Sequence, residues 1–170
     1  MKKLLSLLSI FILITACTGD PGPPGPQGPQ GINGEIALAF ETPPIDFTET
    51  NNFEVFFEFQ NFGINVFPND VALVYRLKDS FNGEPIWQQV PQTVIFNDGS
   101  FFIYNSDFTQ VDLRIFLEDS FNLNSLGTEW TQNQIFRVVV VPAESARTMD
   151  NLNIDKVMKK FNITSFEKLN

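Results

Sequence analysis

Few side chains of this sequence could carry out chemistry. The 170 residues include no histidine and one cysteine, Cys17. A Ser-His-Asp or Cys-His catalytic arrangement needs an imidazole, and a single cysteine allows neither an intramolecular disulfide nor a thiolate zinc cluster. The sequence also lacks a Gly-rich phosphate loop and a Gly-x-Ser-x-Gly nucleophile motif. We therefore expect a protein that is not an enzyme and that uses no cofactor and no metal.

Aromatic side chains are the remaining candidates for ligand binding. Trp87, Tyr104 and Trp130 would form a platform for stacking a sugar ring if the fold brings them together. In the alternative interpretation they are partly buried packing residues. A repeated Asp-Ser-Phe-Asn segment, at 79–82 and 119–122, could form paired ligand or calcium loops. It lacks the spaced carboxylates of a calcium loop, which favours two turns at strand ends.

The first 17 residues predict a targeting segment that directs the protein to a membrane. Two lysines precede an apolar run from Leu4 to Thr15, which is too short to span a bilayer. Residues 14–17 read Ile-Thr-Ala-Cys, which resembles the lipobox of bacterial lipoproteins; the alternative is an ordinary secretory peptide with a chance cysteine. The resemblance implies that residues 1–16 are removed as a signal peptide and that Cys17 carries the lipid anchor. Thr18 stands where an Asp would retain such a protein at the inner membrane, so we expect the outer membrane of a bacterial envelope.

A glycine recurs at every third position after the cysteine. These residues are Gly19, Gly22, Gly25, Gly28, Gly31 and Gly34, with many prolines between them. The Gly-X-Y pattern resembles collagen and predicts a stalk over residues 17–34. Two states are open: a single polyproline II strand, which would extend about 50 Å, or a triple helix, in which only glycine fits at the axis. The triple helix would make the protein a homotrimer.

The composition changes after the stalk. Short runs rich in Phe, Val and Ile alternate with Asn, Asp, Gly and Pro, a pattern typical of strands joined by turns. The predicted strands are 35–41, 53–60, 71–78, 86–90, 92–97, 100–105, 111–118 and 135–141. Seven to eight strands over 35–142 predict an all-β head, an immunoglobulin-like β-sandwich. Residues 143–170 form a C-terminal extension.

Alternation within these strands assigns their faces. The residues assigned to the core are Phe53, Val55, Phe57, Phe59, Val71, Leu73, Tyr75, Leu77, Val111, Leu113, Ile115 and Leu117. The charged residues assigned to the opposite, solvent-facing side are Glu54, Glu58, Arg76, Lys78, Asp112, Arg114 and Glu118. The residues expected to be nearly fully buried are Phe57, Leu73, Val94, Leu113, Ile115 and Val139.

Two dipeptides predict tight hairpin turns, Asn82-Gly83 and Asp98-Gly99. A two-residue turn at the second would pair Phe96 with Phe101 and Val94 with Ile103, and would place both turn residues at positive φ.

Helical spacing of apolar residues predicts one short helix at about 153–161. These apolar residues are Ile154, Val157, Met158 and Phe161. Asn153 suits the N-cap, and Lys159 and Lys160 suit the last turn. The apolar side of this helix would pack against the sandwich or, alternatively, lie on a membrane surface.

The net charge of the protein and its resemblance to a known family limit the possible classes of function. The net charge of −9 would become −11 without the lysines of residues 1–16, which excludes nucleic acid as a partner because such a surface repels phosphates. The lipobox, the Gly-X-Y tract and the segments LVYRL (73–77), LRIFLE (113–118) and NQIFRVVVVPA (133–143) resemble small collagen-like lipoproteins of bacteria. This resemblance implies architecture and location without an activity. We expect a lipid-anchored envelope protein with a structural or adhesive head; the alternative is a carbohydrate- or protein-binding accessory module of a surface uptake system.

Overall fold

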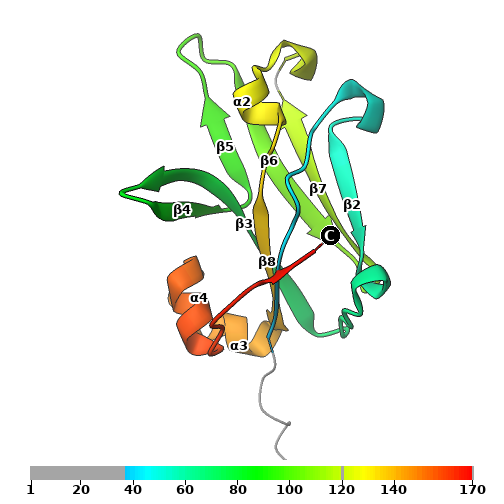
Figure 1. The fold of residues 1–170 in the computed structure, drawn as a ribbon, viewed down its shortest axis with the longest axis vertical. Coiled ribbons are helices and arrows are strands. Elements are labelled where there is room, and N and C mark those ends of the chain that lie inside the picture. The colour runs from blue at the N-terminus through cyan, green and yellow to red at the C-terminus, as the bar shows by residue number, and fades with distance from the viewer. Residues whose placement is uncertain (1–36, 120, 170) are drawn as a thin grey trace, which may run out of the picture. The chain divides into compact units, whose positions relative to one another are not determined.

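The computed structural model describes residues 37–119 and 121–169, which form mostly β-structure in two sheets (Figure 1). The predicted signal peptide, Cys17 and the six glycines of the stalk lie outside the described residues. The first sheet has the strand order β4-β3-β8-β1-β9, and the second has the order β2-β7-β6-β5. The pairing is nested, because β1 lies beside β8 in one sheet while β2 lies beside β7 in the other.

The element bounds match the predicted strands closely. The first sheet contains β1 (Leu38–Glu41), β3 (Asp70–Phe81), β4 (Glu84–Gln89), β8 (Phe136–Pro142) and β9 (Glu167–Lys168). The second contains β2 (Glu54–Glu58), β5 (Gln92–Ile95), β6 (Phe101–Phe108) and β7 (Asp112–Asp119). The helical elements are η2 (Glu49–Asn51), η3 (Phe59–Phe62), η4 (Leu123–Ser125), α2 (Thr128–Thr131), α3 (Ala143–Arg147) and α4 (Ile154–Lys160). Each predicted strand corresponds to one of β1–β8. Among the elements of the described residues, β9, α2, α3 and the three short 3-10 helices were not predicted.

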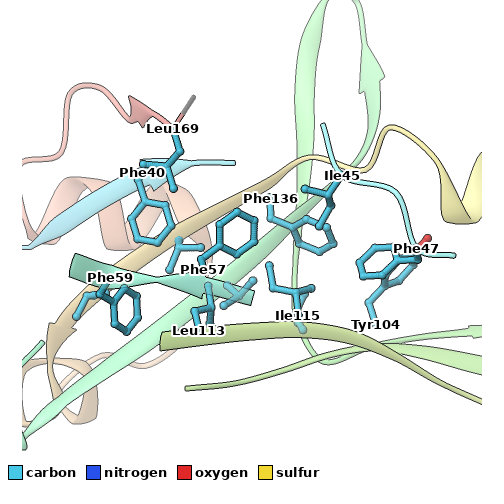
Figure 2. Close-up of a cluster of buried hydrophobic side chains, with 14 of the residues drawn as sticks. Phe40, Ile45, Phe47, Phe57, Phe59, Tyr104, Leu113, Ile115, Phe136 and Leu169 are labelled. Atoms are coloured by element: carbon cyan, nitrogen blue, oxygen red, sulfur yellow. The ribbon is translucent and has the colours of Figure 1, made fainter. Parts of the chain in front are cut away.

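One apolar cluster lies between the two sheets. The first sheet contributes Phe40 and Phe136, and the second contributes Phe102 and Tyr104, all of them buried. Figure 2 shows Leu169 next to Phe40 at one end of this cluster and Phe47 next to Tyr104 at the other. Because a buried Phe contributes about 1.5–3 kcal/mol, this cluster holds the sheets together.

A second cluster covers the opposite face of the first sheet. Leu73, Tyr75 and Val139 of the sheet pack there against Ile154 and Val157 of α4. The predicted helix and its packing against the sheet are therefore confirmed. Asn153 caps the helix as expected, since its side chain accepts a hydrogen bond from the Asp155 amide at 2.9 Å.

The inner strand β3 is consequently covered on both faces, which corrects the placement of Arg76. The sequence placed this residue on the solvent side, whereas its exposed fraction is 4%. Alternation sends Leu73 and Tyr75 toward α4 and sends Val74 and Arg76 toward the second sheet. A charged residue on an alternating strand faces solvent only if one side of the sheet is open, and here neither side is.

Most other predictions of burial hold, although four residues assigned to the core are only half-buried, namely Phe53, Val55, Val71 and Leu77. Five of the six residues expected to be nearly fully buried are buried, and Val94 is half-buried. Val111 is 57% exposed, because it lies in the β6–β7 turn that Thr109 closes by hydrogen bonds with Asp112. Arg114 faces outward as expected and pairs with Glu54 at 3.2 Å and with Asp107.

The two predicted hairpin turns differ in length. Asn82 and Gly83 both have positive φ (52° and 85°), so this turn contains two residues as predicted. At the second hairpin only Gly99 has positive φ (86°), and the Phe96 amide donates to the Ser100 carbonyl at 2.8 Å. The extra loop residue shifts the register by one, so the predicted pairs Phe96–Phe101 and Val94–Ile103 are wrong. Val94 pairs with Phe102 instead.

Candidate functional site: an aromatic hollow

A hollow of about 420 Å³ opens where the β5–β6 hairpin meets the segment from Phe121 to Trp130. Its apolar lining is Phe96, Phe121, Leu126 and Trp130, and its polar lining is Asp98, Ser100, Ser125 and Glu129. A hollow of this volume is within the usual range for small-molecule sites, which are mainly apolar with a few placed polar groups.

Three half-buried rings and Leu126 form the apolar part of the hollow. Phe96 lies at the centre, 6.0 Å from Phe121 and 6.2 Å from Trp130 between ring centroids, with interplanar angles of 71° and 84°. Phe96 also stacks on the buried Phe102 at 5.9 Å. The hollow is therefore an outward continuation of the aromatic core between the sheets.

Two carboxylates stand beside these rings. Asp98 accepts hydrogen bonds from both the hydroxyl and the amide of Ser100, at 2.6 and 3.0 Å. These bonds, the hydroxyl first, lower the pKa of Asp98, so it is ionised at neutral pH. The carboxylate of Glu129 folds back over Gly127, where an added Cβ would lie 2.2 Å from its Oε2 atom.

Buried polar groups fix the segment that carries Trp130. The Tyr104 hydroxyl donates to the Trp130 carbonyl at 2.5 Å. The Gln134 side chain donates to the carbonyls of Glu129 (3.0 Å) and Gln132 (2.7 Å). Gln134 in turn accepts from the Arg76 Nε atom at 2.8 Å. The sheets thus position the segment through hydrogen bonds made beneath the hollow.

Arg76 is the charged member of this network. Its guanidinium carbon lies 4.2 Å from the centre of the Tyr104 ring and 6.0 Å from that of Trp130. In the described part of the chain no carboxylate pairs with it, and its second hydrogen bond goes to Gln92 at 3.4 Å. Burial lowers the pKa of Arg76. Ring faces and amide oxygens therefore stabilise its charge in place of an ion pair.

The three aromatic residues proposed from the sequence do not form one platform. Trp130 lines the hollow, and Tyr104 lies buried beneath it. Trp87 packs in the second cluster, on the other face of the first sheet, where the Arg137 guanidinium lies 4.2 Å from its ring and 4.3 Å from that of Phe166. Trp87 is thus a packing residue in this structure.

Sequence reasoning missed most of the hollow. In the sequence, Asp98 is recognisable only as a turn residue, and Phe121 only as part of the repeated segment 119–122. The two copies of that segment lie at the ends of strands in different sheets, so they form no paired loops. The fold brings residues 96–100 close to residues 121–130. No pattern within either segment predicts this contact.

Comparison with known proteins adds no assignment. No protein family, no curated protein and no solved structure matches the chain. Within residues 37–119 and 121–169, no helix is both long and apolar enough to cross a membrane. In the same residues, no three His, Cys, Asp or Glu side chains are grouped so that they could hold a metal ion.

Proposed function

We propose that this protein is a lipid-anchored envelope protein that displays an adhesive β-sandwich head on a collagen-like stalk. The position of the hollow is the observation that carries the proposal. The chain enters the head through Leu38, which pairs with Val140 near the end of β8, whereas Trp130 precedes the start of β8 at Phe136. Seven residues of strand span about 20 Å, so the hollow lies at the end of the head that is remote from Leu38. In Figure 1, α2 accordingly lies at the opposite end of β8 from α3.

The immunoglobulin-like class of the head is part of this proposal. The size of the head and its two sheets with a shared core support it. An immunoglobulin-like classification must also agree with the observed strand pairing, in which β1 lies beside β8 and β2 lies beside β7.

The anchor is tested by Cys17→Ser. Because Cys17 is the only cysteine, this variant should lose metabolic labelling by palmitate and accumulate as a precursor. Label retained in the variant would contradict the anchor.

Display at the cell surface is tested at the hollow itself. Ser125 is exposed on its rim, and lipidation occupies the thiol of Cys17, so Ser125→Cys would introduce one free thiol. We expect a membrane-impermeant maleimide to label this variant on intact cells. Labelling that requires permeabilised cells would place the hollow inside the envelope and would refute display.

The state of the stalk has a separate test. Gly25→Ala places a methyl group at the crowded axis of a triple helix, whereas Gln27→Ala changes a position that faces outward. A loss of trimer on sedimentation in the first variant alone would support three chains. Equal sedimentation of both variants, on vesicles as well as in solution, would leave the tract as a single-strand spacer.

The hollow also favours a second candidate function, a binding module that serves a surface uptake system. Three rings with two carboxylates at the exposed end of a head suit capture of a small ligand as well as attachment. Phe121→Ala would then lower uptake of the ligand by cells rather than their attachment to a surface.

A further inference from the structure

The charges around the hollow do not balance. Asp98 and Glu129 line it, and no lysine or arginine does. Within the described residues, neither carboxylate takes part in an ion pair. A positive charge lies in the interior beside Trp130: Arg76 is buried, with its guanidinium carbon 6.0 Å from the centre of that ring. Two negative charges on the open side therefore face one positive charge in the interior.

The hydroxyl groups of the lining are already engaged as donors. Ser100 donates to Asp98 at 2.6 Å, and Ser125 donates to the Asn122 carbonyl at 2.7 Å. Apart from the indole N–H of Trp130, the lining side chains therefore present oxygen acceptors and ring faces. A neutral sugar is bound best where donors and acceptors are both offered, whereas a cation needs only acceptors and π-faces.

We propose that the hollow binds the alkylammonium group of a small organic cation. This inference rests on the proposed role of the hollow as the ligand site of the head. Phe121 and Trp130 pack edge-to-face on Phe96, at 6.0 and 6.2 Å between ring centroids, so no cation fits between these rings. The cation would instead lie against the ring surfaces that line the hollow, since a ring attracts a positive charge within about 6 Å of its centre. Asp98 and Glu129 supply two negative charges, and Arg76 supplies one positive charge. The site therefore has one net negative charge, which a single bound cation would neutralise.

Gly127 provides a way to test the position of one carboxylate without changing any charge. Its backbone angles, φ −65° and ψ 156°, are open to alanine. A methyl group there would collide with the Glu129 carboxylate at 2.2–2.5 Å, and that flexible side chain would swing away. Gly127→Ala therefore displaces the carboxylate, whereas Glu129→Gln removes its charge in place.

The experiment is calorimetric titration of the full lipidated protein, held in a non-ionic detergent. The probe is choline chloride, and the matched control is 3,3-dimethylbutan-1-ol, which has the same shape without the charge. We expect saturable binding of choline that is about tenfold tighter than binding of the alcohol. Equal binding of the two, or no binding of choline, would overturn the inference.

Variants then locate the binding. Glu129→Gln and Gly127→Ala should each weaken choline binding about five- to tenfold while leaving the melting temperature unchanged. Phe121→Ala should abolish it. Glu84→Gln removes a charge from the exposed tip of the β3–β4 hairpin and should have no effect. A loss with Glu84→Gln equal to that with Glu129→Gln would show attraction by the overall charge and would overturn the site.

Two further probes separate the alternatives. Phosphocholine adds a phosphate that both carboxylates repel, so it should bind more weakly than choline; tighter binding would assign the hollow to a lipid headgroup and refute the free amine. Binding of maltotetraose without choline would make the hollow a sugar site, refuting the ammonium inference while leaving the proposed head function intact. Failure of surface labelling would refute display and leave choline binding untouched.

Discussion

Removal of the Tyr104 hydroxyl tests which hydrogen bond positions the Trp130 segment that lines the hollow. Tyr104→Phe removes one oxygen from a fully buried side chain, and with it the hydrogen bond to the Trp130 carbonyl. Leaving this part-buried carbonyl without a partner costs about 1–3 kcal/mol. For a head of this size, we expect the melting temperature to fall by about 3–10 °C.

Tyr75→Phe is a matched control. The Tyr75 hydroxyl is also buried and donates to a loop carbonyl, that of Leu152, at 2.7 Å. That loop lies before α4, on the face of the first sheet that is remote from the hollow. The two variants should therefore lose similar stability, but only Tyr104→Phe should loosen the segment that carries Trp130.

Fluorescence separates the two variants. In a Trp87→Phe background Trp130 is the only tryptophan. Tyr104→Phe should increase the quenching of Trp130 by acrylamide and shift its emission to the red, whereas Tyr75→Phe should change neither. Equal quenching in the two variants would refute the argument that Tyr104 positions the hollow, and an unchanged melting temperature in Tyr104→Phe would refute the strength assigned to its hydrogen bond.

Burial raises the pKa of Tyr75 and Tyr104 above the ordinary 10.0, so the folded state retains these protons longer than the unfolded state. The free energy of unfolding should fall above about pH 10, by about 1.4 kcal/mol per pH unit for each tyrosine, and a double Phe variant should lack this part of the slope in denaturant titrations. Phe57→Ala should cost about 3–5 kcal/mol, whereas Arg114→Ala on the exposed face should cost less than about 1 kcal/mol; equal shifts in the denaturation midpoint would contradict the assignment of faces. Gly99→Val should destabilise the head although the site has open space, because φ of 86° is strained for a β-branched residue; a neutral result would mean that the loop can change its conformation.

Local pattern was sufficient to predict β1–β8 and α4. Alternation located Phe57, Leu113 and Ile115 in the core, because one face of the second sheet is open to solvent and the period of two is visible. The spacing of apolar residues and the cap at Asn153 defined α4. These features depend on neighbours within a few residues, which a single sequence contains.

Contacts between residues that are far apart in the chain could not be predicted from the sequence. The burial of Arg76 depends on the second sheet on one side of β3 and on α3 and α4 packed behind the other, which alternation within 71–78 cannot reveal. The one-residue error at Gly99 arose because Asn97-Asp98-Gly99 fits a two-residue and a three-residue loop equally well until the register is known. The hollow was missed for the same reason, since the fold alone brings Phe96 next to Phe121.

The place of β1 in its sheet has a mechanical consequence. β1 lies between antiparallel β8 and parallel β9, and Glu41 at its end pairs with Arg137 at 2.9 Å and with Lys168 at 3.6 Å, one on each neighbour. A pull between the start of β1 and a ligand in the hollow runs along the strand axis. Hydrogen bonds perpendicular to that axis are then loaded in shear and share the force, instead of opening one after another. If the protein is anchored and holds a ligand as proposed, the force would therefore be applied along the direction in which these hydrogen bonds share the load.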